Sequence, residues 1–380
     1  MRVGILTMYY ENYSYGGLLQ AYALQQVVKN MGYECEQITY DYNERFREKP
    51  AYPSTVVGKL KKCRRKMIER RFQDILKRHN DITNKKYHEF MEFIPHSKRY
   101  GMKDFPEVRD DYDVFIVGGD QVWNMDYCDE NFFLLTVEME RKISYSASAG
   151  KDSLNETEMK VLTKGINSFS YVSVREKLLK GMMDSVVDSP IEVVIDPVFL
   201  PAKSFWDNLK IPAHIKGKYV LVYLLGYDEK ERKKAIKLAR KTGLQVVFIP
   251  FANVGFCKGE EKVGDIQAWS VGPREFLGLI DGAEYILTDS FHATAFSIIF
   301  KKNFYCFSRP NKGFLMNSRI DSLLEMSGLK ERYVDLKELD RIRIETIEYD
   351  KYLEKIENFR KYSTEWLQSA LTQIKGAFVK

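Results

Sequence analysis

The sequence predicts an α/β protein built from two Rossmann-like domains that face one another across a cleft. Two observations support this prediction: apolar runs typical of buried strands alternate with helical segments, and the alternation stops after Pro197 and then resumes. Strands separated by helices require crossover connections, which produce parallel sheets. The 380 residues also exceed what one hydrophobic core usually supports. We expect residues 1–200 and 201–345 to form the two domains, and residues 346–380 to form a helix across their junction.

The first half begins with an expected strand at residues 3–7. Gly16 and Gly17 open a helix that runs to about Met31, and Gly32 stands where a helix C-cap belongs. Further strands are expected at residues 33–40, 114–117, 143–147, 171–174 and 193–195.

The second half follows a segment at residues 198–218 that contains Pro201 and Pro212 and shows no sustained period. This composition predicts a linker. Beyond it we expect strands at residues 219–225, 245–249, 285–288 and 303–307, and helices at residues 229–241, 273–280, 293–300 and 347–375.

Composition favours a cytoplasmic protein without a metal. Five scattered cysteines form no Cys-x-x-Cys pair, which argues against both a disulfide framework and a structural zinc site. The N-terminus lacks a signal-peptide cleavage site, and no apolar run approaches the ~18 residues needed to span a bilayer. The net charge of +6 is mild, and we expect no nucleic-acid partner.

One segment is strongly basic. Residues 59–78 contain ten Lys or Arg and two acids, with apolar residues at helical spacing, which predicts a basic amphipathic helix. Such a helix either rests on an anionic membrane surface, which would place the protein peripherally at the inner face of the membrane, or is a solvated helix packed by its apolar stripe.

His292 is the leading catalytic candidate, because it follows an expected buried strand and an imidazole can both give and accept a proton near neutral pH. The alternative is a packing histidine. Asp289 and Ser290 flank it, and no acid occurs from residue 293 to residue 320, which favours an anionic ligand. The cations of that stretch are Lys301, Lys302, Arg309, Lys312 and Arg319.

A second polar cluster follows the expected strand at residues 114–117. Gly119 allows close approach of a ligand, Asp120 offers a carboxylate, and Gln121 and Asn124 can bond hydroxyls. Trp123 presents a flat face of the kind on which sugars stack. This mixture predicts a carbohydrate site; in the alternative, Asp120 caps a turn and Trp123 fills the core.

Asn12, Tyr15, Gly16 and Gly17 follow the first strand, and we expect them on the acceptor side of the site. There the glycines either let backbone amides approach an anion or serve the turn alone.

Ser146 lies in a run of alternating serines at a strand end, where the hydroxyls line either a crevice or one sheet face. Arg175 ends another strand, and its guanidinium is suited to a carboxylate or phosphate, or to pairing with an acid such as Glu176.

Taken together and in this order, these motifs resemble the polysaccharide pyruvyl transferase family. The resemblance rests on residues 12–24 (NYSYGGLLQAYAL), 117–124 (VGGDQVWN), 145–148 (YSAS), 173–176 (SVRE), 196–197 (DP) and 288–292 (TDSFH). It implies the domain arrangement of glycosyltransferase-B enzymes and phosphoenolpyruvate as donor, with no cofactor. The implied product is a sugar that carries pyruvate as a ketal across two hydroxyls.

The resemblance also implies roles for two residues: His292 as general acid and base, and Arg175 as an anchor for the donor. That Asp120 is a base near the acceptor is our own hypothesis. One branch of the family has an arginine two positions before the histidine, where this chain has Ser290. We expect a cation from the acid-free stretch to replace it, with Lys312 and Arg319 as nearest candidates and Arg309 behind them.

Two other functions stay open at this point. A nucleotide-sugar-dependent glycosyltransferase would share the architecture, since a fold does not determine a function. A non-catalytic glycan-binding relative would keep the acceptor site alone. The acceptor sugar is undetermined, but a lipid interaction of residues 59–78 would favour a polyprenyl-diphosphate-linked oligosaccharide.

Overall fold

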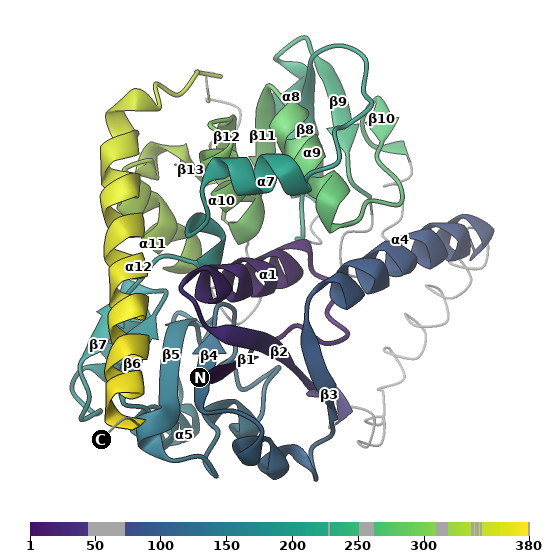
Figure 1. Ribbon diagram of the computed structural model, residues 1–380. Coiled ribbons are helices and arrows are strands. Elements are labelled where there is room, and N and C mark those ends of the chain that lie inside the picture. Colours follow the sequence, from purple (N-terminus) through teal and green to yellow (C-terminus); the bar gives the residue numbers. More distant parts are fainter. Residues whose placement is uncertain are drawn as a thin grey trace, which may run out of the picture.

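The computed structural model describes residues 1–44, 73–226, 229–250, 262–308, 318–335, 338, 342 and 344–378. Within these residues the chain forms two parallel β-sheets, each flanked by helices (Figure 1). The predicted α/β fold with two Rossmann-like domains is confirmed. Residues 59–72 of the basic segment, together with Arg309 and Lys312, lie outside the described residues.

The N-terminal sheet has the order β3-β2-β1-β4-β5-β6-β7, with parallel neighbours throughout. The order reverses between β1 and β4, so a ligand is expected beyond the carboxyl ends of these strands. The strands are β1 (Arg2–Leu6), β2 (Glu34–Tyr40), β3 (His96–Tyr100), β4 (Val114–Gly118), β5 (Lys142–Ala147), β6 (Tyr171–Val174) and β7 (Ile191–Val193), and the helices of this half are α1 (Tyr15–Asn30), α4 (Gln73–Phe93), α5 (Glu156–Ile166) and α6 (Lys177–Met183).

The C-terminal sheet has the order β10-β9-β8-β11-β12-β13 and is also parallel. Its order reverses between β8 and β11. The strands are β8 (Tyr219–Tyr223), β9 (Gln245–Phe248), β10 (Ile266–Gln267), β11 (Tyr285–Thr288), β12 (Asn303–Phe307) and β13 (Tyr333–Val334), and the helices are α7 (Lys203–Leu209), α8 (Glu229–Arg240), α9 (Pro273–Gly282), α10 (Phe291–Ile299) and α11 (Ser318–Ser327).

The largest hydrophobic cluster lies between the two sheets and joins residues of α1, α9, α10 and the C-terminal helix α12 (Asp350–Phe378). Figure 1 shows α1 between the sheets. Alternate residues of the central strands face the other side of each sheet, where each sheet has one smaller hydrophobic cluster. The two halves therefore share a packed interface.

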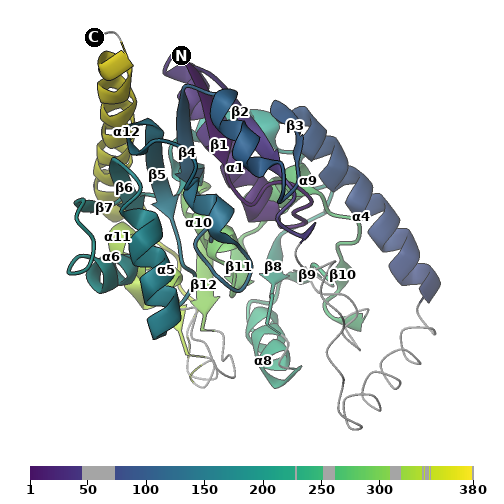
Figure 2. The ribbon, with the colours of Figure 1, turned by 90° about the horizontal axis from the view of Figure 1, so that it is seen from below.

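Helix α12 contacts both halves of the chain, through β6 in the first and α11 in the second, and Figures 1 and 2 show it running along one side of the molecule. Near its start, the hydroxyl of Tyr349 donates to the carbonyl of Lys302 at 2.6 Å. Near its end, the hydroxyl of Tyr171 in β6 donates to Oε1 of Gln373 at 2.7 Å. No helix among the described residues is long and apolar enough to cross a membrane.

Several features differ from the sequence prediction: the strand expected at residues 193–195 is observed as β7 at Ile191–Val193, and the short strands β10 and β13 were not predicted. The expected linker contains helix α7, which is held by the buried Trp206, whose Nε1 donates to the carbonyl of Val198 at 3.1 Å. Strand β3 was not predicted, because its sequence HSKRY is polar. It lies at the edge of the sheet, where charged side chains reach solvent and protect the free edge.

Candidate functional site

His292 lies in the first turn of α10, directly after β11, and not in a loop before a helix that starts at Ala293 as expected. The helix starts earlier because Ser290 is its N-cap, and Oγ of Ser290 accepts the amide of Ala293 at 3.4 Å. The carboxylate of Asp289 accepts the amides of Leu225 and Gly226, both at 2.7 Å, and so ties this turn to the end of β8. The histidine is thus held at the point where the strand order reverses.

Arg175 and Asp196 complete a buried cluster with this histidine. Nη1 of Arg175 donates to Oδ2 of Asp196 at 2.8 Å, and Nε2 of His292 lies 3.8 Å from the same oxygen. The guanidinium of Arg175 lies over the ring of Phe291, 4.4 Å from its centroid. The Arg175 side chain is only 3% exposed. The sequence indicated Arg175 and His292 as separate candidates. In the fold both lie next to the carboxylate of Asp196.

Two buried nitrogen atoms of this cluster have no hydrogen bond to the described residues. Within the described part of the chain, neither Nε2 of His292 nor Nη2 of Arg175 has a hydrogen-bond partner. Buried polar groups in proteins are nearly always paired, so such atoms call for an explanation. Both are able to bind an anionic ligand.

The electrostatics of the cluster keep the imidazole neutral. Burial lowers the pKa of His292 well below its usual value, and the positive charges of Arg175 and Arg319 lower it further. Burial raises the pKa of Asp196 to about 6, although the neighbouring Arg175 acts in the opposite direction. Burial by itself would lower the pKa of Arg175, but Glu176, Asp196 and Asp120 raise it above its usual value.

Asp120 belongs to the same region. Its charge raises the pKa of both Arg175 and Asp196, so it lies close to the buried cluster. It follows β4, the second strand at the reversal of the N-terminal sheet. Oδ1 of Asp120 accepts the amide of Gln121 at 2.9 Å, which fixes the carboxylate at the turn.

Ser146 has the backbone conformation of a strained residue. Its φ of 51° places a non-glycine residue in the left-handed region. Its Oγ is buried and has no hydrogen-bond partner among the described residues. Strain of this kind, held by surrounding structure, often occurs at functional sites.

Gly16 is the point where the N-terminal half touches His292. A Cβ at Gly16 would overlap the imidazole ring. Asn12 shapes the turn before this helix: its Nδ2 donates to the carbonyl of Met8, and its Oδ1 accepts the amide of Ser14 at 2.9 Å. A Cβ at Gly17 would in turn overlap Asn12. The two glycines therefore permit close packing of α1 against α10 and against its own turn.

A family model described as polysaccharide pyruvyl transferase matches residues 15–311, well over half of the chain. The chain belongs to the polysaccharide pyruvyl transferase family. The resemblance inferred from the sequence is thereby confirmed. No curated protein matches the chain.

Solved structures show the same fold in other proteins. UDP-GlcNAc 2-epimerase of Methanocaldococcus jannaschii, in complex with UDP-GlcNAc and UDP, is 15% identical in sequence, with a TM-score of 0.50. The match covers 98% of this chain and 100% of the epimerase chain. The UDP-GlcNAc 2-epimerase of Neisseria meningitidis bound to UDP-GlcNAc is 11% identical, with coverage of 98% and 100% and a TM-score of 0.52. This likeness shows the glycosyltransferase-B-like fold, as expected, and nothing more.

Two aromatic residues proposed to bind the acceptor face the protein interior. Trp123 is 1% exposed and stacks on Phe133 with their ring centroids 5.9 Å apart, so it fills the core and has no free face for a sugar. Tyr15 stacks on Phe276 at 4.4 Å, and its hydroxyl donates to the carbonyl of Val271 at 3.3 Å. Tyr15 therefore joins the two halves of this family member and does not contact an acceptor.

Of the remaining predicted residues, three serve the local turn and one, Arg319, lies close to His292. Gln121 and Asn124 bond to each other, with Nδ2 of Asn124 donating to Oε1 of Gln121 at 3.0 Å. Gly119, at φ 87°, lies where a Cβ would overlap Gln20, so it serves the packing of the turn. Arg319 in α11 is buried and close enough to lower the pKa of His292, as a replacement cation must be.

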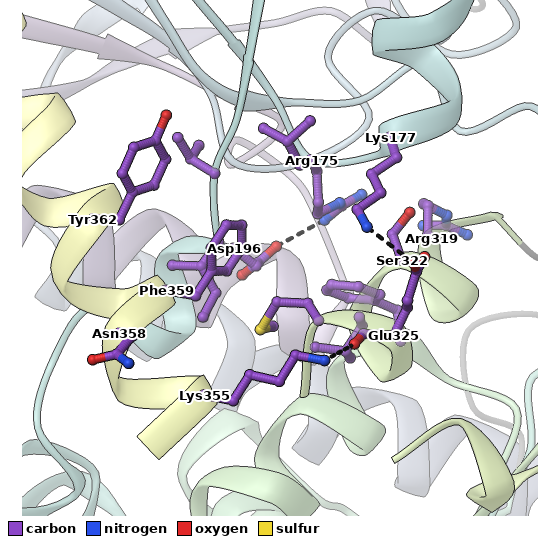
Figure 3. Close-up of a pocket in the computed structure, with 16 residues that line it drawn as sticks. Arg175, Lys177, Asp196, Arg319, Ser322, Glu325, Lys355, Asn358, Phe359 and Tyr362 are labelled. Carbon is purple, nitrogen blue, oxygen red and sulfur yellow. Dashed lines mark hydrogen bonds and ion pairs between the residues drawn. The ribbon is translucent and has the colours of Figure 1, made fainter. Parts of the chain in front are cut away.

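A pocket of about 450 Å³ opens beside this cluster (Figure 3). Arg175 and Asp196 line it on the side of the cluster, and Arg319 lines it from α11. Asp196 is the member of this cluster to which the sequence assigned no role, although the Asp-Pro pair at a strand end was visible. In the described ranges, no three His, Cys, Asp or Glu residues lie together as metal ligands would.

Proposed function

We propose that this protein transfers the enolpyruvyl group of phosphoenolpyruvate to two hydroxyls of a sugar, in a polysaccharide or lipid-linked precursor, as a pyruvate ketal. Family membership supports the class of reaction. One observation supports the donor. The buried Nε2 of His292 lacks a hydrogen bond among the described residues, and the positive charges of Arg175 and Arg319 are close enough to lower the pKa of this histidine. Phosphoenolpyruvate carries the two anionic groups that such cations bind.

The proposed chemistry needs one proton at carbon and two hydroxyl additions. His292 protonates the methylene carbon of phosphoenolpyruvate, which becomes a methyl group, and the adjacent carbon becomes electrophilic. One sugar hydroxyl adds to that carbon and loses its proton to a base. The bond between that carbon and the phosphate ester oxygen then breaks, phosphate leaves, and the second hydroxyl adds to the same carbon and gives its proton to the phosphate. The reaction balances without a redox step or a cofactor.

Donor binding would prepare His292 for its role as an acid. Without a neighbouring anion the imidazole is neutral, because burial and the two arginines lower its pKa. A bound dianion adds negative charge beside the ring and favours the charged imidazolium. The histidine therefore gains its proton when the donor is in place, and it can then deliver that proton to the donor.

We assign the acceptor to the side of Asp120. This carboxylate follows β4 at the strand-order reversal and acts electrostatically on both Arg175 and Asp196. A carboxylate at this place is suited to take a proton from an attacking hydroxyl. Ser146, which is strained and has an unpaired Oγ within the described structure, is a candidate to bond the same sugar.

The test is to incubate the full chain with phosphoenolpyruvate and candidate lipid-linked or soluble glycans. We expect phosphate release that depends on the acceptor, and a product with the mass increment of a pyruvate ketal. His292→Gln should lower the rate by at least about 100-fold, the scale of a lost general acid.

His214→Gln is the matched control, because His214 is exposed in the segment between the two sheets and should tolerate the change. Full activity of His292→Gln would remove the histidine from the chemistry. Consumption of a nucleotide sugar in place of phosphoenolpyruvate would instead indicate a glycosyltransferase, and binding of glycan without turnover would indicate a non-catalytic relative.

A further inference from the structure

The pocket beside the cluster is larger than the proposed donor requires. Its volume of about 450 Å³ lies in the range of roughly 300–1,000 Å³ that is typical of small-molecule sites. A three-carbon acid would fill only part of it. His292 does not line the pocket, which lies between the end of β7, α11 and α12. Figure 3 shows residues of α11 and α12 facing one another across it.

The walls combine an apolar surface with an excess of positive charge. Four of the lining side chains are cationic and two are carboxylates. Both carboxylates are already paired: Asp196 with Arg175 at 2.8 Å, and Glu325 with Lys177 at 3.0 Å. Nζ of Lys355 donates to a main-chain carbonyl at 2.7 Å. The apolar part includes Phe291, Leu323, Met326 and Phe359.

Arg175 gives this pocket a built binding group. Its side chain is 97% buried and lines the pocket, and its Nη2, which is itself closed off from solvent, has no hydrogen-bond partner in the described chain. Leaving a buried donor unpaired costs about 1–3 kcal/mol, more for a charged group. An anion in the pocket would remove this cost by drawing the guanidinium round so that Nη2 reaches it.

We propose that the pocket binds a soluble amphipathic anion as an effector. Its apolar body would lie against Phe359 and Met326, and its anionic group would bind Arg175 and Arg319. Such a ligand would draw Nη2 of Arg175 away from the donor, so effector and phosphoenolpyruvate would weaken each other's binding by the same factor. The pocket inference stands on its own geometry, and only this coupling depends on the proposed function.

The binding test uses calorimetry of the full chain with octyl phosphate, kept below the concentration at which it forms micelles. We expect one molecule per chain, and binding at least about tenfold tighter than that of inorganic phosphate or of octanol. Equal affinity of octanol, or no binding of octyl phosphate, would overturn the proposal.

Ser322→Trp should abolish this binding, because Ser322 lines the pocket from α11 and a tryptophan there fills it. The matched control is Ser369→Trp, at an exposed position of α12 outside the pocket. Lys355→Gln tests the charge without adding bulk and should weaken binding about threefold, the scale of an exposed ion pair. If Ser322→Trp and Lys355→Gln both left the affinity for octyl phosphate unchanged, the ligand would bind elsewhere and the proposal would be wrong.

The last measurement separates the two proposals. With phosphoenolpyruvate present, octyl phosphate should bind more weakly, and the reverse titration should show the same factor. Binding of both ligands without mutual effect would overturn the effector role. If octyl phosphate binds as described and phosphoenolpyruvate does not bind at all, the pocket stands and the proposed function fails.

Discussion

A histidine that is 9% exposed beside two arginines is held in its neutral form. The folded state therefore gains stability from His292 above its usual pKa of 6.5 and loses it as the pH falls below that value. The stability contribution of Asp196 depends on pH in the opposite direction. Its pKa is raised from 3.8 to about 6, so its contribution is present below 3.8 and lost as the pH rises through about 6. The two arginines that lower the pKa of His292 would favour a ligand that brings negative charge to the imidazole.

At the residue scale, we predict that phosphoenolpyruvate binding takes up protons through His292. The imidazole is neutral in the free protein at pH 7, and the bound dianion raises its pKa, so up to one proton is gained. The measurement is calorimetry in two buffers of different ionisation enthalpy at pH 7. His292→Gln should remove this uptake and leave only the proton change of the donor phosphate itself, which the arginines bias toward release. The same uptake in the variant would contradict the assignment.

At the scale of elements, the first turns of α1 and α10 meet at Gly16 and His292. Each turn begins with a serine N-cap: Oγ of Ser14 accepts the amide of Gly17 at 3.3 Å, and Ser290 caps α10. The caps fix where each helix starts, and the missing side chain at Gly16 lets the two starts approach. The position of the imidazole therefore depends on both halves of the chain.

We predict that Gly16→Ala lowers ketal formation by at least about tenfold, because the added methyl group displaces the His292 ring by a distance that catalysis does not tolerate. The free energy of unfolding should fall by about 1–3 kcal/mol, the usual cost of overpacking. Rates and chemical denaturation measure the two effects.

Gly181→Ala is the control for Gly16→Ala. Gly181 lies in α6 and has open space around it, so alanine there should stabilise by about 0.5–1 kcal/mol without changing the rate. If Gly16→Ala kept full activity, the contact would have no role in positioning the histidine.

At the scale of the whole molecule, the two sheets share one hydrophobic cluster and one long helix. Helix α12 bonds to the chain immediately before Asp196, where the amide of Ile195 donates to Oγ of Ser363 at 2.9 Å. Ser363 is buried in the middle of that helix. The helix therefore supports the segment that carries the carboxylate of the cluster.

We predict that Ser363→Ala lowers the free energy of unfolding by about 1–3 kcal/mol, because the buried amide of Ile195 loses its acceptor. Chemical denaturation should still show one transition, since the sheets share a core. Ser369→Ala, on the exposed face of the same helix, should stay within about 0.5 kcal/mol of the unsubstituted protein. Equal stability of both variants would argue against this support.

Much of the fold was predictable, because local period and turn residues determine strands and helices. The alternation of apolar and helical segments placed β1, β4, β5, β6, β8 and β11 within a few residues of their observed bounds. Strand β3 escaped prediction because its polar residues reflect an edge position, and α7 because two prolines nearby suggested a linker. Both depend on residues that are distant in the sequence, because β3 pairs with β2 and Trp206 of α7 packs against Phe296.

The candidate site was predictable only as separate pieces. His292, Arg175 and Asp120 stood out because polar residues at the ends of parallel strands meet at one edge of a sheet. Trp123 was misplaced, since its sequence neighbours do not show that Phe133 and Phe169 cover it. Asp196 was overlooked as a site residue because its partner Arg175 is 21 residues away.

The sequence by itself determined the alternating elements, the polar strand ends and the motifs of the family, because each depends on residues that are close along the chain. Tertiary structure alone decided that Asp196 joins Arg175 to His292, that Gly16 packs on the imidazole, and that α11 and α12 enclose a pocket. These contacts arise from the strand order and from the packing of one sheet against the other, and both join residues that are far apart in the chain.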